Sequence, residues 1–289
     1  MTHQIETAAN LLLSDDSTLH EAAHDVVYRR LAIVNICLIG NPKSFVLVDA
    51  GLPLTAPLIR GACETRFGAG ARPDAILMTH GHFDHVGALE TLAAEWDVPI
   101  YAHELERPYL DGSAAYPPGD PSVDSGLMAK LAPLYPTKPV DVSRWLRTLP
   151  EDHSVPALAG WRWLHTPGHS VGHVSFWREA DRLLVAGDAV ITTDQESAYA
   201  AVVTHEAEIH GPPRYFTVDW DAARESARAI AALAPMKIVS GHGPALGGPA
   251  LATSLKNLAD VFDRVARPER GIYLAHPARA ADGSAYRAP

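Results

Sequence analysis

The most informative stretch of this chain is Ile76-Leu77-Met78-Thr79-His80-Gly81-His82-Phe83-Asp84-His85-Val86-Gly87. It opens as a short apolar strand and leads into a helix, so the loop between them is held at both ends. Four side chains of the kind that bind metal ions fall within six residues, namely His80, His82, Asp84 and His85. Gly81 lets the backbone turn sharply between two imidazoles. A structural role does not explain this spacing, which predicts that His80 and His82 face one metal ion while Asp84 and His85 reach a second.

Three other short segments each offer one more ligand beside a glycine at the end of a predicted strand. They are Thr166-Pro167-Gly168-His169, Gly187-Asp188 and Gly241-His242. The backbone can approach closely at such positions, and the side chains project into a shared cleft. We therefore expect His169, Asp188 and His242 to complete the site. Imidazole and carboxylate ligands together suit zinc, and iron or manganese also accept them.

Taken in this order, the motifs resemble those of the metallo-β-lactamase superfamily over roughly residues 25–260. The resemblance implies an α/β fold, a four-layer αββα sandwich, with two divalent metal ions at one edge of the sheets. It implies that the first metal is held by His80, His82 and His169. It also implies that the second is held by Asp84, His85 and His242, with Asp188 bridging the two.

Two residues outside this ligand set are predicted to lie behind it. Asp49, in Val48-Asp49-Ala50-Gly51, falls where the superfamily has a carboxylate behind the ligands, and there it would orient a histidine. The alternative for Asp49 is a simple turn residue at a strand end. His173 follows His169 by four residues, and either a similar supporting position or packing in the core would explain it.

Two features of the sequence disfavour particular members of this superfamily. True β-lactamases of the superfamily generally lack the bridging aspartate, which Asp188 supplies here. Hydroxyacylglutathione hydrolases and iron persulfide dioxygenases usually carry G-C-G-R soon after the G-D motif, whereas Ala-Val-Ile-Thr-Thr-Asp follows Asp188. Recognition of glutathione in that manner is therefore not expected. The stretch from Gln195 to Phe216 resembles small bacterial metallo-hydrolases of this fold whose substrates are not settled.

We expect a single domain over residues 1–289 that acts on a small molecule. The chain is 47% hydrophobic and 20% charged, and its net charge of −10 disfavours nucleic acid as a partner. Apolar runs are too short to span a membrane, and the N-terminal segment does not read as a secretory signal. Two cysteines, Cys37 and Cys63, fit a reducing compartment. We therefore expect a cytoplasmic protein, and its oligomeric state stays open.

Strand-like and helix-like segments alternate along the chain, as expected of an α/β protein. Strands are predicted at 26–39, 44–48, 75–78, 100–102, 161–165, 174–177, 182–186 and 237–240, and helices at 55–67, 86–95, 123–131, 221–233 and 250–265. Residues 108–139 contain seven prolines and form an insertion, either a lid or binding loop with apolar contacts or a tolerated surface segment. The tail at 267–289 is expected to be loosely docked.

The chemistry expected of such a site is hydrolysis, with a metal-bound hydroxide attacking the carbonyl of a lactone, ester or thioester. Asp84, besides binding metal, would be catalytic by orienting the nucleophile or passing on its proton. Tyr199, His210 and Tyr215 lie on a polar loop where they would bind substrate or simply face solvent. Two alternatives stay open, an iron-dependent oxidoreductase on the same fold and a binding protein without catalysis.

Overall fold

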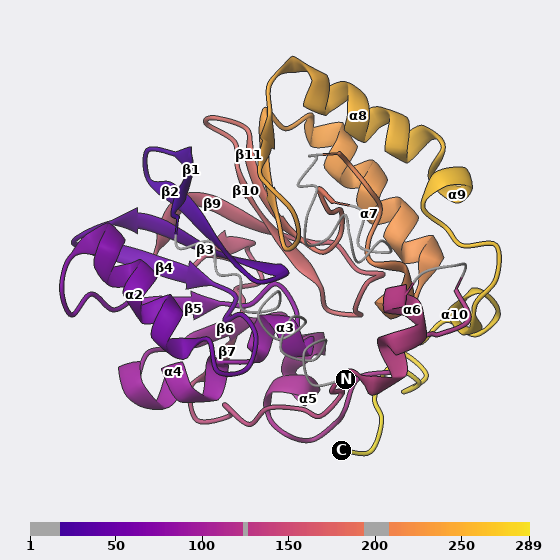
Figure 1. Cartoon of the computed structure of the whole chain (residues 1–289), viewed down its shortest axis with the longest axis horizontal. Coiled ribbons are helices and arrows are strands. Elements are labelled where there is room, and N and C mark those ends of the chain that lie inside the picture. The colour runs from indigo at the N-terminus through magenta and orange to yellow at the C-terminus, as the bar shows by residue number, and fades with distance from the viewer. Residues whose placement is uncertain (1–17, 124–126, 194–207) are drawn as a thin grey trace, which may run out of the picture.

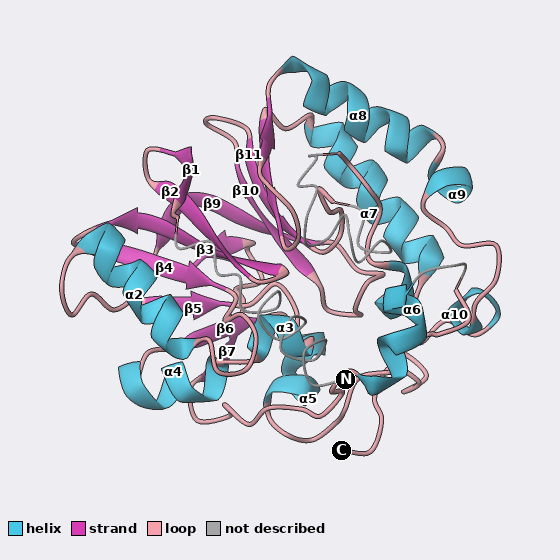
Figure 2. Cartoon of the chain, viewed as in Figure 1, coloured by secondary structure: helices cyan, strands magenta, loops and turns pink. Residues whose placement is uncertain are grey.

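Two β-sheets pack face to face and carry helices on their outer surfaces, in a computed structural model that describes residues 18–123, 127–193 and 208–289 (Figure 1). In Figure 2 the helices lie on the two outer sides of the paired sheets. This is the four-layer αββα arrangement, so the predicted fold class is confirmed.

The first sheet has seven strands in sequence order, of which the first four are antiparallel and the last four are joined in parallel. They are β1 (His20–Ala23), β2 (Val26–Leu31), β3 (Val34–Asn41), β4 (Ser44–Val48), β5 (Ala75–Leu77), β6 (Ile100–Ala102) and β7 (Leu146–Thr148).

The second sheet has six strands in the order β13-β12-β11-β10-β9-β8, and only β11 and β12 pair in parallel. They are β8 (Ser154–Val155), β9 (Leu158–His165), β10 (Val174–Arg178), β11 (Leu183–Gly187), β12 (Lys237–Ser240) and β13 (Leu246–Gly247).

Both faces of the central strands are buried, which explains their continuous apolar runs. On β3, Ile36 and Leu38 point to the helices outside the first sheet, while Cys37 and Ile39 point to the core between the sheets. The side chains of β11 alternate in the same way. Leu183 and Val185 point to the core between the sheets, and Leu184 and Ala186 point to the helices outside the second sheet. Because successive side chains alternate, each sheet contributes to two cores at once.

The helices cover these outer faces. Against the first sheet pack α2 (Ala56–Phe67) and α4 (Leu89–Trp96), and against the second pack α7 (Trp220–Leu233) and α8 (Pro249–Asp260). Asp219 begins α7 by accepting hydrogen bonds from the backbone N–H groups of Asp221 and Ala222. The short helix α3 (Phe83–Val86) lies between the two helical layers, at the end of the sandwich (Figure 1).

Three predicted elements are each divided in two in the structure. The helix predicted at 250–265 is α8 and α9 (Phe262–Val265), which are separated at Val261. The run 26–39 is two strands, because Ala32 adopts a left-handed conformation with φ 57° and reverses the chain between β2 and β3. The helix predicted at 86–95 is two, α3 and α4, separated at Gly87 and Ala88. A Cβ at Gly87 would lie 2.1 Å from the backbone nitrogen of Pro53, so only glycine allows this close approach.

Residues 108–139 pack against the body of the protein. They include α5 (Arg107–Leu110), α6 (Leu127–Leu131) and the 3-10 turn η2 (Ala132–Leu134). The buried side chains of Tyr109, Tyr116 and Ala132 form a cluster with Tyr215 and Phe216, which are more than 80 positions later in the sequence.

The tail is held more firmly than its composition suggests. It contains α10 (Ile272–Ala275) and buries Tyr273 and Ala285. The hydroxyl of Tyr109 donates to the carbonyl oxygen of Ala285 at 2.8 Å, and Arg287 pairs with Ala115 through an isolated β-bridge. The expectation of a loosely docked tail is therefore wrong for these residues. No helix among the described residues is both long and apolar enough to cross a membrane.

Candidate metal centre

The seven ligand-type side chains predicted from the sequence converge at one end of the sandwich, and all are buried. His80 to His85 follow β5, Asp188 follows β11 and His242 follows β12, while His169 lies in the connection from β9 to β10. Their ligand atoms form three overlapping groups, each within 4.8 Å: His80, His82 and His169; His80, His85 and Asp188; and Asp84, His85 and His242.

Several of these atoms lack a hydrogen-bond partner although they are buried. They are His80 Nε2, His85 Nε2, His169 Nδ1 and Asp188 Oδ1. A buried polar atom left unsatisfied costs about 1–3 kcal/mol. A bound divalent cation would satisfy such atoms, and imidazole and carboxylate are ligands that these cations accept. The residues present therefore fit a metal centre.

The electrostatics of the cluster divide the histidines into two kinds. Burial lowers the pKa of His82 to about 3 and holds the pKa of His80 and His169 well below the usual range. These imidazoles are neutral, the form that binds metal. Burial also opposes protonation of His85 and His242, but nearby carboxylates, Asp188 above all, raise the pKa of both.

Asp49 lies directly behind His85, where the sequence places a supporting carboxylate. Its Oδ2 accepts hydrogen bonds from His85 Nδ1 and Thr79 Oγ1, each at 2.8 Å, and its Oδ1 accepts the backbone N–H of Thr79. Asp49 itself is left-handed, with φ 60°. This contact fixes the ring of His85 so that Nε2 faces the other ligands.

His173 is likewise buried beside the ligands and does not join them. Its Nε2 accepts the backbone N–H of Asp188 at 2.8 Å, and its Nδ1 lies 2.9 Å from Thr166 Oγ1. His242 is held from behind by the carbonyl oxygen of Ile33, 2.7 Å from its Nδ1. Each of these contacts fixes the segment that carries a ligand.

Glu106 is the buried site residue that the sequence analysis missed. Its Oε2 accepts the backbone N–H of Gly81 at 2.7 Å, and its Oε1 accepts Ser170 Oγ at 2.7 Å and the backbone N–H of Gly172 at 2.8 Å. One carboxylate thus joins the loop of His80 and His82 to the loop of His169.

The two glycines make this contact sterically feasible. A Cβ on Gly172 would lie 2.8 Å from Glu106 Cγ, and a Cβ on Gly81 would lie 2.9 Å from Tyr109 Cβ. Burial raises the pKa of Glu106 to about 7, although its three hydrogen-bond donors act against this shift. Its partners are mainly backbone groups, so no local motif marks this residue in the sequence.

A small cavity of about 10 Å³ opens onto the ligands. That volume holds about one water molecule. It is lined by His82, Asp84, His169, Asp188 and His242 together with Ile33, Phe83, Tyr135, Pro213, Tyr215 and Phe216.

Of the predicted substrate residues, Tyr215 lines this cavity. His210 does not, since it faces a separate hollow beside α8 and lies 3.9 Å from Glu208. Tyr199 lies outside the described residues.

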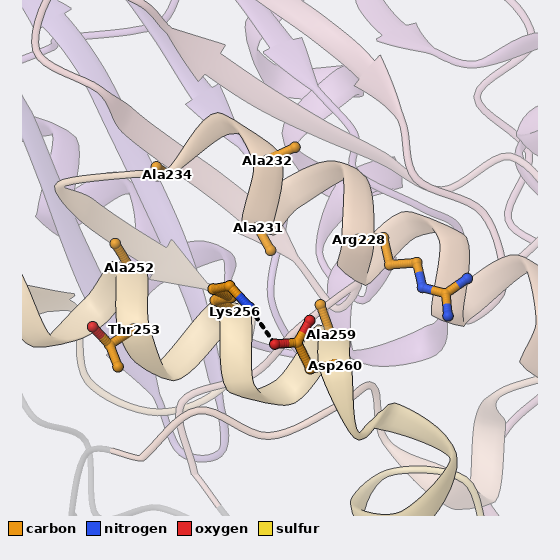
Figure 3. Close-up of a pocket in the computed structure, with 9 residues that line it drawn as sticks. All are labelled: Arg228, Ala231, Ala232, Ala234, Ala252, Thr253, Lys256, Ala259 and Asp260. Carbon is orange, nitrogen blue, oxygen red and sulfur yellow. Dashed lines mark hydrogen bonds and ion pairs between the residues drawn. The ribbon is translucent and has the colours of Figure 1, made fainter.

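A larger hollow of about 680 Å³ lies on the surface between α7 and α8 (Figure 3). Its walls are mostly alanine, and both of its cations are paired, Lys256 with Asp260 and Arg228 with Glu225. It offers none of the imidazole and carboxylate convergence of the metal centre, so the chemistry belongs to the smaller cavity.

The chain is similar in sequence and in fold to proteins of the metallo-β-lactamase superfamily. Residues 29–242 match the family described as "Metallo-beta-lactamase superfamily". "Probable metallo-hydrolase YflN" of Bacillus subtilis (strain 168) is 46% identical over 243 residues, which cover 83% of this chain and 92% of that protein. "Hydroxyacylglutathione hydrolase" of Methylobacterium nodulans is 27% identical, over 81% of this chain and 74% of that protein. A solved B3 metallo-β-lactamase with an active-site glutamic acid superimposes with a TM-score of 0.59 at 17% identity, over 88% of this chain and 91% of that one.

We predict that Glu106→Gln weakens metal binding by about 10–100-fold, the range typical of groups that orient ligands. In the variant, an amide NH₂ group would replace one of the carboxylate oxygens that accept a backbone N–H. Two donors would then face each other, so at least one hydrogen bond between the two loops is lost. Competition with a chromophoric chelator measures the affinity. Glu104→Gln is the matched control, because Glu104 is exposed on the same turn, η1 (Glu104–Glu106). Equal affinities of the two variants would show that Glu106 does not hold the ligands.

The same variant isolates the titration of Glu106 in the metal-free protein. Because the pKa is about 7 when folded and ordinarily 4.5, the folded chain holds this proton more tightly than the unfolded chain between those values. The unfolding free energy of the parent relative to Glu106→Gln should therefore fall as pH rises through this window, by about 3 kcal/mol. Urea unfolding in chelator measures it, and a constant or rising difference would contradict the prediction.

Proposed function

The chain belongs to the metallo-β-lactamase superfamily, and we propose that it is a binuclear metal-dependent hydrolase acting on a lactone, ester or thioester of a small molecule. The observation that carries this proposal is the convergence of seven buried ligand-type side chains, four of whose polar atoms have no hydrogen-bond partner. A chain that only kept the fold would be expected to have lost some of these ligands.

The grouping of the ligands supports two metal positions. His80, His82 and His169 would hold the first metal, and Asp84, His85 and His242 the second. Asp188 would bridge them, since its Oδ1 lies 3.5 Å from His85 Nε2 and its Oδ2 lies 3.4 Å from His169 Nε2. Zinc is the metal we propose, because these ligands suit it, with iron or manganese as alternatives.

Divalent metals held by these residues would supply an activated water and polarise a carbonyl oxygen. The chain supplies the rest. Asp84 lines the cavity, so its carboxylate is placed to take the proton of a water held there. Phe83, Tyr135 and Phe216 exclude bulk water from the same space. Asp49 and His173 keep His85 and Asp188 oriented throughout.

The relatives support hydrolysis as the reaction class. A protein named as a probable metallo-hydrolase matches across most of this chain, and a hydroxyacylglutathione hydrolase, whose name denotes a thioester hydrolase, matches at lower identity. We keep lactone, ester and thioester together because each presents a carbonyl carbon that the same nucleophile would attack. Cys37 and Cys63 are buried free thiols, which agrees with a reducing, cytoplasmic setting.

We predict that zinc-loaded protein hydrolyses members of a panel of lactones, esters and thioesters, and that Asp84→Asn lowers kcat/KM by about 10²–10⁴-fold. His82→Ala should abolish the activity while the circular dichroism spectrum is unchanged. His24→Ala is the control, because its side chain is 94% exposed. Full activity in His82→Ala would refute the ligand assignment. Oxygen consumption by iron-loaded protein, without any hydrolysis, would replace the hydrolase by an oxidoreductase.

A further inference from the structure

We infer that the substrate presents an uncharged, apolar group to the wall of the metal cavity, and that the site discriminates against an anionic group placed there. The inference rests on the proposed function and specifies its substrate class. It follows from which side chains line the cavity and where the cations of the chain lie.

The wall opposite the ligands is aromatic and apolar. Phe83 and Tyr135 stack with their ring centroids 5.4 Å apart, and the ring of Phe216 lies 5.1 Å from that of His82. Ile33 and Pro213 complete the same wall. A group of the substrate that leaves the reacting carbonyl in this direction meets carbon surface, which favours apolar substituents.

Among the described residues, the carboxylates that line the cavity are those of the ligands Asp84 and Asp188, and no lysine or arginine lines it. The segments 1–17, 124–126 and 194–207 contain neither residue type, so all 24 cationic side chains belong to the described part of the chain. A distal carboxylate of a substrate would therefore lose its hydration without gaining a cationic side chain as partner.

The two arginines nearest the wall in sequence are already engaged with backbone. Arg214 follows Pro213, and its Nε and Nη2 donate to the carbonyl oxygens of Ala266 and Val265 at 2.8 Å and 2.6 Å. Arg30 precedes Ile33, and its Nε donates to the carbonyl oxygen of Ala32 at 2.7 Å. Both guanidinium groups hold the chain that surrounds the cavity.

Positive charge at the metal ligands would not stabilise a substrate carboxylate that lies far from the reacting carbonyl. Bound divalent metals would attract an oxygen adjacent to the reacting carbonyl, and they would do so for all the substrates considered. A group four bonds further out would meet the wall instead. Ile33, Phe83 and Tyr135 are half-buried, so the wall reaches the surface of the protein, where a longer substrate group can lie.

The test uses a pair of metal-chelating ligands that differ only at the far end. Hexanohydroxamic acid ends in a methyl group, and adipic acid monohydroxamic acid ends in a carboxylate at the same chain length. Calorimetric titration into zinc-loaded protein should show the neutral ligand binding at least about tenfold more tightly, which corresponds to about 1.4 kcal/mol. Equal affinity, tighter binding of the anionic ligand, or binding of neither would overturn the inference.

Two variants of Ile33 test whether the apolar wall causes the preference for the neutral ligand. Ile33→Lys adds a cation at the cavity and keeps the carbonyl oxygen that binds His242 Nδ1, while Ile33→Gln adds a polar side chain without charge. The preference for the neutral ligand should shrink at least about threefold in Ile33→Lys and stay within about twofold in Ile33→Gln, as expected for a nearby opposite charge. An unchanged preference in Ile33→Lys would overturn the assignment to the wall.

Binding and turnover separate this inference from the proposed function. The 4-nitrophenyl esters of hexanoic acid and of adipic acid, the latter as the monoester, give the matching comparison of kcat/KM. If neither ester nor any thioester or lactone is hydrolysed while the neutral hydroxamate still binds more tightly, the hydrolase proposal fails and the wall inference holds. If both esters are hydrolysed equally and the hydroxamates bind equally, the wall inference fails and the hydrolase proposal holds.

Discussion

The burial of five imidazoles and two carboxylates in one small volume is the constraint on which the rest of this structure depends. Groups of this kind are costly to remove from water unless each finds a partner. Here the partners include other members of the cluster, and the atoms left over are those that a metal ion would bind. The sandwich makes this possible because β5, β11 and β12 end at the same edge, so loops distant in sequence deliver their side chains to one point.

A set of buried hydrogen bonds then holds the ligands from behind. Asp49 fixes the ring of His85, His173 fixes the backbone of Asp188, and Glu106 joins the first two histidine loops to each other. None of these residues need touch a substrate. They determine whether the ligands are already in place when a metal arrives, and preorganisation of this kind is what distinguishes a tight site from a loose one.

The ligands could be predicted from sequence because each has a local signal, an imidazole or carboxylate next to glycine at the end of an apolar strand. Glu106 has no such signal, since its three partners lie 25, 64 and 66 residues away and two of them are backbone groups. The turn at Ala32 was missed because residues 31–34 are all apolar and include none of the glycine, proline, asparagine or aspartate residues that usually mark a turn. The packing of the tail depends on a few contacts, such as Tyr109 with Ala285, that follow no periodic pattern.

We propose that one chain holds two metal ions through these seven side chains. The most direct test is the metal content of the protein after saturation with zinc and removal of free metal, measured by mass spectrometry of the metal and by amino-acid analysis. We expect two zinc ions per chain in the parent and at most one after His82→Ala. Less than one ion per chain in the parent, or the same content in the variant, would contradict the account.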